Sequence, residues 1–384
     1  MSERVVQVYA VPPWPLVTGQ KRGSYEFLLS ASKLDNVNFL GLWCSVEEKD
    51  AWDHLRSHLH LGTRLHLAHA KSHWSPLFGT IMDWLKSDCF YGRLSGDKLL
   101  AQLQPDVVHA DMFWSSALAL RAKNCKKILF VTDHYSKGAW RAIFHSNYFK
   151  GKASNVIRFL GFSMIERFVY RGFDTLIVAG AADAQSLGRV SGARTVTYPI
   201  PIRAKQSVRA FRDRSKIIIG GNYRVDCIRE GTAKFVRLFL QKTQWPKREI
   251  LILGPGAVQA FGEVANSARA ISVRDHAPNW EDILAESIAY VYPQLCGSGM
   301  QVKLVEALSQ GSVPICAPHI AAGQMVDDFG NGFVFSDYDQ LWDRVIALDQ
   351  NEALYERLAS SGRNLIQRHF HPESVTELLK QLYH

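Results

Sequence analysis

The spacing of hydrophobic residues along the chain predicts two successive series of strands and helices. Short apolar runs recur, and most are followed by a glycine-containing or polar loop and then by a stretch with helical spacing. Apolar runs that alternate with helices are typical of parallel sheets whose strands are buried on both faces. In the first series we expect strands at 5–11, 38–44, 106–110, 128–131, 173–180 and 195–202.

The alternation pauses at residues 202–214, where the sequence IRAKQSVRAFRDR is polar and basic. We interpret this segment as a linker between two domains. A second series follows, with strands expected at KIIIGG, EILILG, ISV, IAYVY, VPIC and GNGFVF. The pattern therefore predicts an α/β protein of two Rossmann-like domains that face each other across a cleft. We expect an N-terminal, acceptor-side domain at 1–202, a C-terminal, donor domain at 203–365, and a helix at 366–384 that packs back on the N-terminal domain.

The most informative stretch is 291–318, which reads as a strand, a glycine loop, a helix and a second strand. Ser298 can cap the helix, and Gln301, three residues later, would complete a capping box. Gly311 is placed to end the helix as the residue after its C-cap. Helix N-termini beside glycine loops bind anions well, because they present free N–H groups and the positive end of the helix dipole.

Lys303 and Glu306 are three residues apart, so they share one face of this helix. A cation for phosphate and a carboxylate for hydroxyl groups would suit a nucleotide-sugar site. An ordinary crossover helix with a solvated Lys–Glu pair has the same pattern, so this stretch alone leaves both interpretations open.

Other polar groups follow predicted strands of the first series. Gly19 lies in a proline- and glycine-containing loop with Lys21 and Arg22, and Ser24 can cap a helix that begins near Tyr25, which makes a second phosphate cradle conceivable. His109 lies at the C-terminal end of one expected strand, with Asp111 two residues later, and Thr132, Asp133 and His134 lie at the end of another. Since parallel strands end at one edge of a sheet, these groups predict a single cleft. Loop and capping functions would also explain them.

Composition narrows the class further. The chain has 384 residues, a net charge of +9 and no CxxC pair among its six cysteines. We therefore expect a cytoplasmic protein without a disulfide framework, with attachment to the inner face of the membrane as a further possibility. The segment 121–171 contains eleven Lys and Arg but only two acidic residues. This excess indicates an anionic partner, namely a membrane surface, a pyrophosphate or a nucleic acid, or else a solvated basic face.

Over nearly its whole length the chain resembles family-4-like glycosyltransferases, whose two domains form the GT-B fold. The similar segments are PPWPLVTGQKRGSYEFL, DVVHAD, ERFVYRGFDTLIVAGAADAQSL, GGNYR and PQLCGSGMQVKLVEALSQGSVPICAP, in this order. The last segment is the most specific match, because it resembles the donor-binding loop and helix. One departure is that Ser298 stands where the family usually has the first of two glutamates, whereas Glu306 matches the second. Another is that Arg229 stands in place of the lysine of the family's diphosphate-binding pair.

The resemblance implies a glycosyltransferase with a nucleotide-sugar donor, for which a UDP-sugar is favoured and a GDP-sugar is the alternative. No DxD-type metal motif stands out, so we expect no metal and no cofactor besides the donor. The donor-binding residues that the resemblance and the strand-end pattern suggest are Gly19, Arg22, Gly221, Arg224, Arg229, Ser298, Gly299, Met300, Gln301, Lys303 and Glu306.

Two residues are candidates for catalysis. If the reaction inverts the anomeric carbon, it requires a general base, and Asp133 is the candidate. If it retains configuration, as in most of the family, His109 would be a donor contact. The acceptor that we favour is a lipid-linked or cell-surface glycan, with the basic 121–171 segment on an anionic membrane. The alternatives are DNA with hydroxymethylated bases, a nucleotide-sugar 2-epimerase reaction, and a catalytically silent binding subunit.

Overall fold

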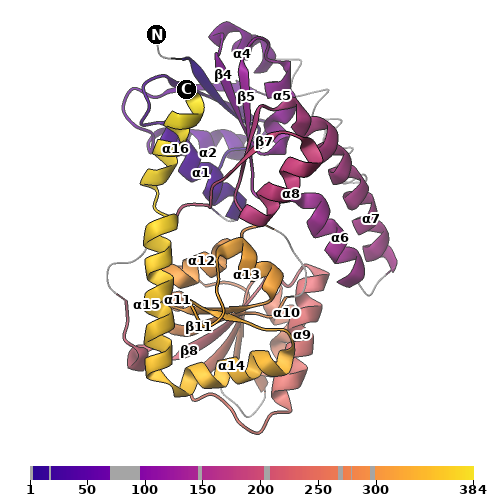
Figure 1. Ribbon diagram of the computed structural model, residues 1–384, viewed down its shortest axis with the longest axis vertical. Coiled ribbons are helices and arrows are strands. Elements are labelled where there is room, and N and C mark those ends of the chain that lie inside the picture. The colour runs from indigo at the N-terminus through magenta and orange to yellow at the C-terminus, as the bar shows by residue number, and fades with distance from the viewer. Residues whose placement is uncertain are drawn as a thin grey trace. The chain divides into compact units, whose positions relative to one another are not determined.

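The computed structural model describes residues 3–16, 19–69, 96–145, 149–202, 208–266, 271–277, 279–294 and 299–384. The chain divides into two compact units, each built around its own parallel sheet (Figure 1). Unit 1 comprises 1–137, 156–201 and 372–384, and unit 2 comprises 138–155 and 202–371.

The sheet of unit 1 has seven strands in the order β3-β2-β1-β4-β5-β6-β7, and all its neighbouring strands pair in parallel. The strands are β1 (Val5–Tyr9), β2 (Val37–Trp43), β3 (Arg64–His69), β4 (Val107–Asp111), β5 (Lys126–Val131), β6 (Thr175–Val178) and β7 (Arg194–Thr197). The helices between these strands are α1 (Gly19–Ala31), α2 (Val46–Arg56), α4 (Asp97–Leu103), α5 (Ser116–Arg121), α6 (Tyr135–His145), α7 (Phe149–Met164) and α8 (Ala181–Ser191).

The sheet of unit 2 has six parallel strands in the order β10-β9-β8-β11-β12-β13. They are β8 (Lys216–Gly220), β9 (Glu249–Leu253), β10 (Ile271–Arg274), β11 (Ser287–Tyr292), β12 (Val313–Cys316) and β13 (Phe333–Val334). The helices of this part are α9 (Asp226–Leu240), α10 (Ala257–Phe261), α11 (Trp280–Ala285), α12 (Val302–Ser309), α13 (Pro318–Gln324), α14 (Tyr338–Gln350) and α15 (Glu352–His369). The last helix, α16 (Glu373–Tyr383), belongs to unit 1, where it packs against α1 (Figure 1).

Both sheets have the strand order of a Rossmann fold. In each one the chain adds two strands on one side of the first strand and then crosses over to continue on the other side. The central strands β1, β4 and β11 are buried at every position, as expected for strands covered by helices on both faces. Ligands of such sheets bind outside the carboxyl ends of the strands where the order reverses. That point lies between β1 and β4 in unit 1 and between β8 and β11 in unit 2.

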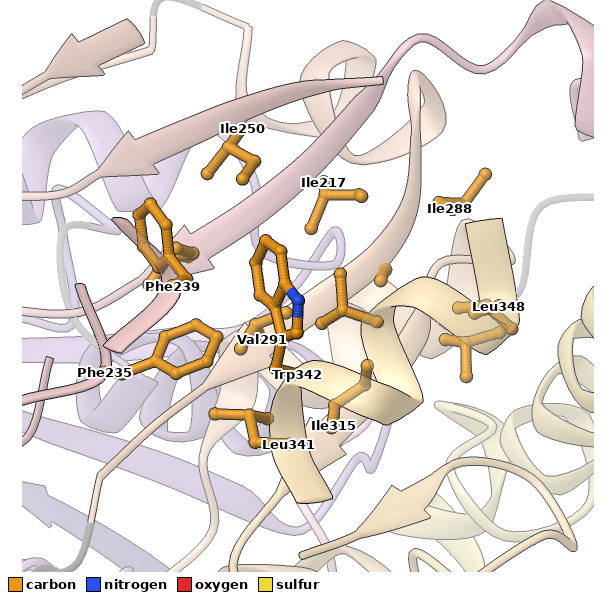
Figure 2. Packing of buried hydrophobic residues seen from close by; sticks show 14 of the residues in the cluster. Ile217, Phe235, Phe239, Ile250, Ile288, Val291, Ile315, Leu341, Trp342 and Leu348 are labelled. Carbon is orange, nitrogen blue, oxygen red and sulfur yellow. The ribbon is translucent and has the colours of Figure 1, made fainter. Parts of the chain in front are cut away.

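Aromatic stacking organises the core of unit 2 (Figure 2). The indole of Trp342, from α14, stacks on Phe239 of α9 with ring centroids 5.5 Å apart and planes 10° apart. The surrounding aliphatic side chains come from the strands and include Ile217, Ile250 and Ile315. This contact joins α9 and α14 in the core of unit 2.

The expected linker at 202–214 is wrong at its C-terminal end. Phe211 belongs to the core of unit 2, and the Arg214 side chain is only 2% exposed. The Arg214 guanidinium donates hydrogen bonds to the carbonyl oxygens of Ser287, at 2.6 Å, and Gln310, at 2.7 Å. The buried Arg214 side chain therefore links the start of β11 to the end of α12, because its donors satisfy backbone carbonyl groups in both segments. Residues 203–207 of the expected linker lie outside the described residues.

The stacked pair predicts a large stability loss on truncation. Trp342→Ala should lower the free energy of unfolding by about 3–5 kcal/mol, because a buried indole and its packing are removed. Urea unfolding followed by circular dichroism would measure this. The control is Leu61→Ala, at a side chain that is 95% exposed, for which we expect a change within about 0.5 kcal/mol. Equal effects of the two substitutions would contradict the assignment of Trp342 to the core.

Candidate functional site

The first polar cluster lies at the switch point of unit 2, where strand β8 ends at Gly220 and Gly221 follows it. A Cβ atom added at Gly221 would lie 2.8 Å from Ile228 and 2.9 Å from the side-chain nitrogen of Gln294. The turn after β9 is equally close, because a Cβ at Gly254 would lie 1.8 Å from the carbonyl oxygen of Gly221. Glycine is thus required at both positions by close approach of the protein's own backbone and side chains.

The loop between β11 and α12 has the expected order of elements but a different cap. Helix α12 begins at Val302, with Gln301 in the N-cap position and no side-chain cap hydrogen bond. The Gln301 side chain instead accepts a hydrogen bond of 2.6 Å from the Tyr292 hydroxyl. The predicted capping box is therefore wrong, because a tertiary contact holds the amide that would complete it. Ser298 lies outside the described residues.

The rest of this stretch agrees with the sequence pattern. Gly299 and Gly311 have φ angles of 70° and 76°, and Gly311 follows the C-cap residue Gln310 as expected. Met300 is buried at 7% exposure next to this loop. The predicted order of strand, glycine loop, helix, glycine stop and strand is thus confirmed.

Trp280 joins the two charged residues of α12. Its indole nitrogen donates a hydrogen bond of 2.7 Å to the Glu306 carboxylate, and the Lys303 ammonium lies 5.1 Å from its ring centroid. Glu306 is buried at 8% exposure, whereas Lys303 is exposed. The Lys303–Glu306 pair is therefore held by a third side chain rather than simply solvated. Sequence reasoning missed Trp280, and its only signal was a tryptophan within the polar stretch HAPNWED.

The two arginines after β8 have different surroundings. Arg224 is exposed in the turn that leads to α9. Arg229, inside α9, forms an ion pair of 2.5 Å with Asp226 and donates to the carbonyl oxygen of Tyr223 at 3.4 Å. Asp226 already occupies part of the guanidinium of Arg229, so Arg224 is the more accessible cation at this turn.

Gln294 is a further polar residue of this region that sequence reasoning missed. It is the second residue after β11 and is fully buried. Its side-chain nitrogen lies 3.4 Å from the carbonyl oxygen of Gly220. Its Oε1 atom has no hydrogen-bond partner among the described residues. Because an unsatisfied buried carbonyl is costly, this atom marks the centre of the switch point as a polar position.

In unit 1, the expected loop around Gly19 is the first turn of a helix. Helix α1 begins at Gly19 and includes Arg22, so both lie in its N-terminal turn. Ser24 is buried inside the helix at 3% exposure, so it is not the predicted cap. The Ser24 side chain instead opposes part of the rise in the pKa of the buried Asp111 carboxyl, an influence that has no signature in local sequence.

His109 does not lie at the end of its strand. It is buried at 3% exposure in the middle of β4, and its Nδ1 atom lies 2.8 Å from the Tyr383 hydroxyl and 3.2 Å from the amide nitrogen of Gln7. Burial lowers the pKa of His109 to about 3. The imidazole is therefore neutral at physiological pH and links the sheet to α16.

The strand ends of unit 1 instead present two carboxyl groups, Asp111 as the last residue of β4 and Asp133 after β5. Burial raises the pKa of each to about 7, and the charge of Asp183 adds to the rise at Asp133. Thr132 donates a hydrogen bond of 2.8 Å to Asp133, and the Oδ1 atom of Asp111 is buried without a hydrogen-bond partner among the described residues. A carboxyl group that titrates near neutral pH can accept and release protons under working conditions.

His134 forms a separate buried network beside Asp133. Its Nε2 atom lies 3.2 Å from the Glu166 carboxylate, and its Nδ1 atom lies 2.7 Å from the Ser186 hydroxyl. Glu166 is fully buried and also accepts hydrogen bonds from the backbone and side chain of Ser136. Both nitrogens of His134 are therefore engaged, and the network fixes the strand end on which Asp133 lies.

Two searches of the described residues bear on cofactors and membranes. No group of three or more His, Cys, Asp or Glu side chains there is arranged to hold a metal ion. None of the helices in the described ranges combines the length and the apolar character that crossing a bilayer requires.

Comparison with known proteins defines the fold. No protein-family model matches the chain, and none of the curated proteins searched matches its sequence. Solved structures match it over essentially its whole length. Sucrose-phosphate synthase from Thermosynechococcus elongatus aligns with a TM-score of 0.74 and 14% identity, covering 99% of this chain and 98% of that one. HepE of Anabaena, in complex with UDP and glucose, aligns with 0.67 and 11%, covering 99% and 98%. TarM of S. aureus, in complex with UDP and other ligands, aligns with 0.66 and 12%, covering both chains completely.

These structures are glycosyltransferases of the GT-B fold. The chain therefore has the GT-B fold with two Rossmann-like units, which confirms the fold class predicted from the sequence.

The raised pKa of Asp111 predicts how the free energy of unfolding changes with pH. The native state binds the Asp111 proton more tightly than the unfolded chain does, so the charged carboxylate costs stability as pH rises from about 4 through about 7. Asp111→Asn removes this cost. It should raise the free energy of unfolding relative to wild type by at least about 1 kcal/mol more at pH 8 than at pH 5.

The control for this measurement is Asp53→Asn, at an exposed carboxylate of α2. It should change the free energy of unfolding by the same small amount at both pH values. If the Asp111→Asn difference is also independent of pH, the carboxyl group is not shifted by burial.

Proposed function

We propose that the protein is a glycosyltransferase that moves a sugar from a nucleotide-sugar donor to an acceptor hydroxyl. The observation that supports this most is the contact of Trp280, the first residue of α11, with Lys303 and Glu306 of α12, in a sheet with a Rossmann switch point. HepE and TarM, which share the fold along the whole chain, were both solved with UDP bound. A UDP-sugar is therefore our first candidate donor, and a GDP-sugar is the alternative.

In this proposal the donor binds at the carboxyl edge of the unit 2 sheet. The diphosphate lies at the N-terminus of α12, where Lys303 and the positive end of the helix dipole neutralise its charge, and the backbone of Gly299, Met300 and Gln301 lies next to it. Glu306, oriented by Trp280, accepts hydrogen bonds from hydroxyl groups of the ribose or the sugar.

The β8–α9 turn supports the donor from the other side of the switch point. Arg224 contacts the phosphates, Gly221 lets them approach the backbone, and Arg229 supports the turn through Asp226 and Tyr223. Gly19 and Arg22, in the first turn of α1, are candidates for a second phosphate contact in unit 1.

Transfer breaks the bond between the anomeric carbon and the diphosphate oxygen and forms a bond from that carbon to the acceptor oxygen. The leaving diphosphate gains negative charge, and the cations at α12 and the β8 turn stabilise it. The acceptor proton requires a base if the reaction inverts configuration. Asp133, with a pKa near 7 and a fixed position after β5, is the candidate. We assign His109 a positioning function, because it is buried and neutral.

For the acceptor we propose a lipid-linked or cell-surface glycan. A DNA acceptor would instead give transfer onto hydroxymethylated duplexes. A 2-epimerase would give an isomerised nucleotide sugar without an acceptor, and a silent subunit would give donor binding without turnover. A thermal-shift screen with UDP-, GDP-, dTDP- and CMP-sugars, followed by assays of nucleotide release, separates these outcomes. A true donor at 100 times its dissociation constant should add about 2.7 kcal/mol of stability.

Lys303 should dominate the affinity for the nucleotide. Lys303→Met removes one charge-assisted hydrogen bond to the diphosphate, so the dissociation constant of UDP should rise about ten- to hundredfold in calorimetry. The control is Lys98→Met, at an exposed lysine of α4, which should bind UDP as wild type does. Unchanged affinity in Lys303→Met would exclude Lys303 from the donor site.

Asp133 should affect turnover and not donor binding. Asp133→Asn keeps the shape of the side chain but cannot accept a proton, so turnover should fall by at least about 100-fold while the dissociation constant of UDP stays unchanged. Measuring the initial rate of UDP release and UDP affinity on the same preparation would test this. Turnover close to wild type would remove Asp133 as the base and favour a retaining reaction.

A further inference from the structure

Helix α7 and the turn that follows it expose a row of large apolar side chains. Val156, Leu160, Met164 and Phe168 follow one another at intervals of four residues, which places them on one face of the helix. Ile157 lies on the same face, because it is three residues before Leu160. Exposure reaches 60% at Ile157, 56% at Leu160, 61% at Met164 and 65% at Phe168. We call these five residues the α7 face.

The other side of the helix is already occupied by the protein. Ile165 is buried in the core of unit 1, and Phe162 stacks on Tyr135 with ring centroids 5.1 Å apart. The α7 face is therefore not needed to attach the helix to unit 1. A helix that is apolar on two sides but covered on only one side leaves the second side for another partner.

The charges on this part of the chain select the type of partner. Arg158, Arg167 and Arg171 are exposed along α7 and the turn after it, and the Arg167 guanidinium lies 6.0 Å from the ring centroid of Phe168. Glu166 is the one acidic residue between 149 and 171, and it is fully buried in the network with His134. Among the described side chains of 149–171, the exposed charged ones are thus all positive.

We propose that the α7 face docks on an anionic lipid bilayer. The apolar side chains would enter the boundary between head groups and acyl chains, while the arginines contact the acidic head groups, as in interfacial amphipathic helices. A nucleic acid would contact the cations but leave the apolar row in water. A second copy of the same face would bring like charges together. The bilayer is the one of these partners that complements both the apolar row and its charged border.

This inference is more specific than the expectation from the basic composition of 121–171. Part of that segment is strand β5, whose last four residues are buried, whereas the α7 face is restricted to five residues of α7 and the segment that follows it. The inference does not depend on the proposed glycosyl transfer, because lipid binding is measured without donor or acceptor.

The test is cosedimentation of the full chain with vesicles of phosphatidylcholine alone and with added phosphatidylglycerol. Wild type should bind the anionic vesicles, and the bound fraction should fall at high salt. The double variant Leu160→Glu with Met164→Glu should bind at least about tenfold more weakly. Two apolar side chains that would enter the lipid are replaced by negative charges, which the anionic head groups repel. Each of Arg167→Glu and Arg171→Glu should weaken binding about fivefold or more.

The matched control is Val46→Glu with Leu61→Glu, at two side chains exposed elsewhere in unit 1. This variant should bind anionic vesicles about as wild type does, apart from a small general effect of added charge. Circular dichroism of all variants checks that they remain folded. Several results would overturn the proposal: no binding of wild type to anionic vesicles, equal losses in test and control variants, binding of duplex DNA through the α7 face without vesicle binding, or a wild-type dimer that the α7 variant converts to a monomer.

Discussion

The structure depends on the pairing of parallel strands, because each such pair must be joined by a crossover connection. Because of the crossovers, all strands of a sheet run in the same direction and end at the same edge. The loops that follow the strands therefore lie together at that edge. Where the order reverses, between β1 and β4 and between β8 and β11, the two neighbouring loops diverge and leave room for a ligand. The glycines after β8 and β9 let these two turns of unit 2 pack closely, because any side chain there would collide with the backbone or with Gln294. The position of the candidate donor site thus follows from topology before any single polar residue is considered.

Within this frame the polar side chains differ in how they are held. In unit 2, the Trp280 indole orients Glu306 and lies beneath Lys303, so charge is presented from a rigid support. In unit 1, Asp111 and Asp133 lie in surroundings that disfavour their charged forms, and their pKa values rise toward neutrality. One unit therefore offers cations and a hydrogen-bonding carboxylate, and the other offers groups that exchange protons. This division of chemistry matches what a transfer from a charged donor to a hydroxyl acceptor requires.

Sequence reasoning succeeded where burial decides structure. Most strands were found because buried parallel strands are apolar on both faces, whereas the edge strand β3 was missed because most of its residues are only partly buried or exposed. Helix α12 with its stop at Gly311 was found because a positive φ favours glycine. It failed where a distant contact redirects a local preference. Ser24 can cap a helix, yet it is buried inside α1, and Gln301 is held by Tyr292. His109, Trp280 and Arg214 are held by hydrogen-bond partners that lie 274, 26 and 96 residues away in the chain, and local sequence does not record such partners.

The central claim is that a nucleotide diphosphate binds at the switch point of the second sheet. Hydrogen exchange measured by mass spectrometry with and without UDP tests this most directly, because it locates the ligand without requiring an acceptor. The account predicts slower exchange in peptides that cover the β8–α9 turn, around Gly221 to Arg229, and the start of α12, around Gly299 to Glu306. The edge strands β3 and β10 should exchange at unchanged rates. Binding of UDP without protection of these two segments, or with protection confined to unit 1, would contradict the account.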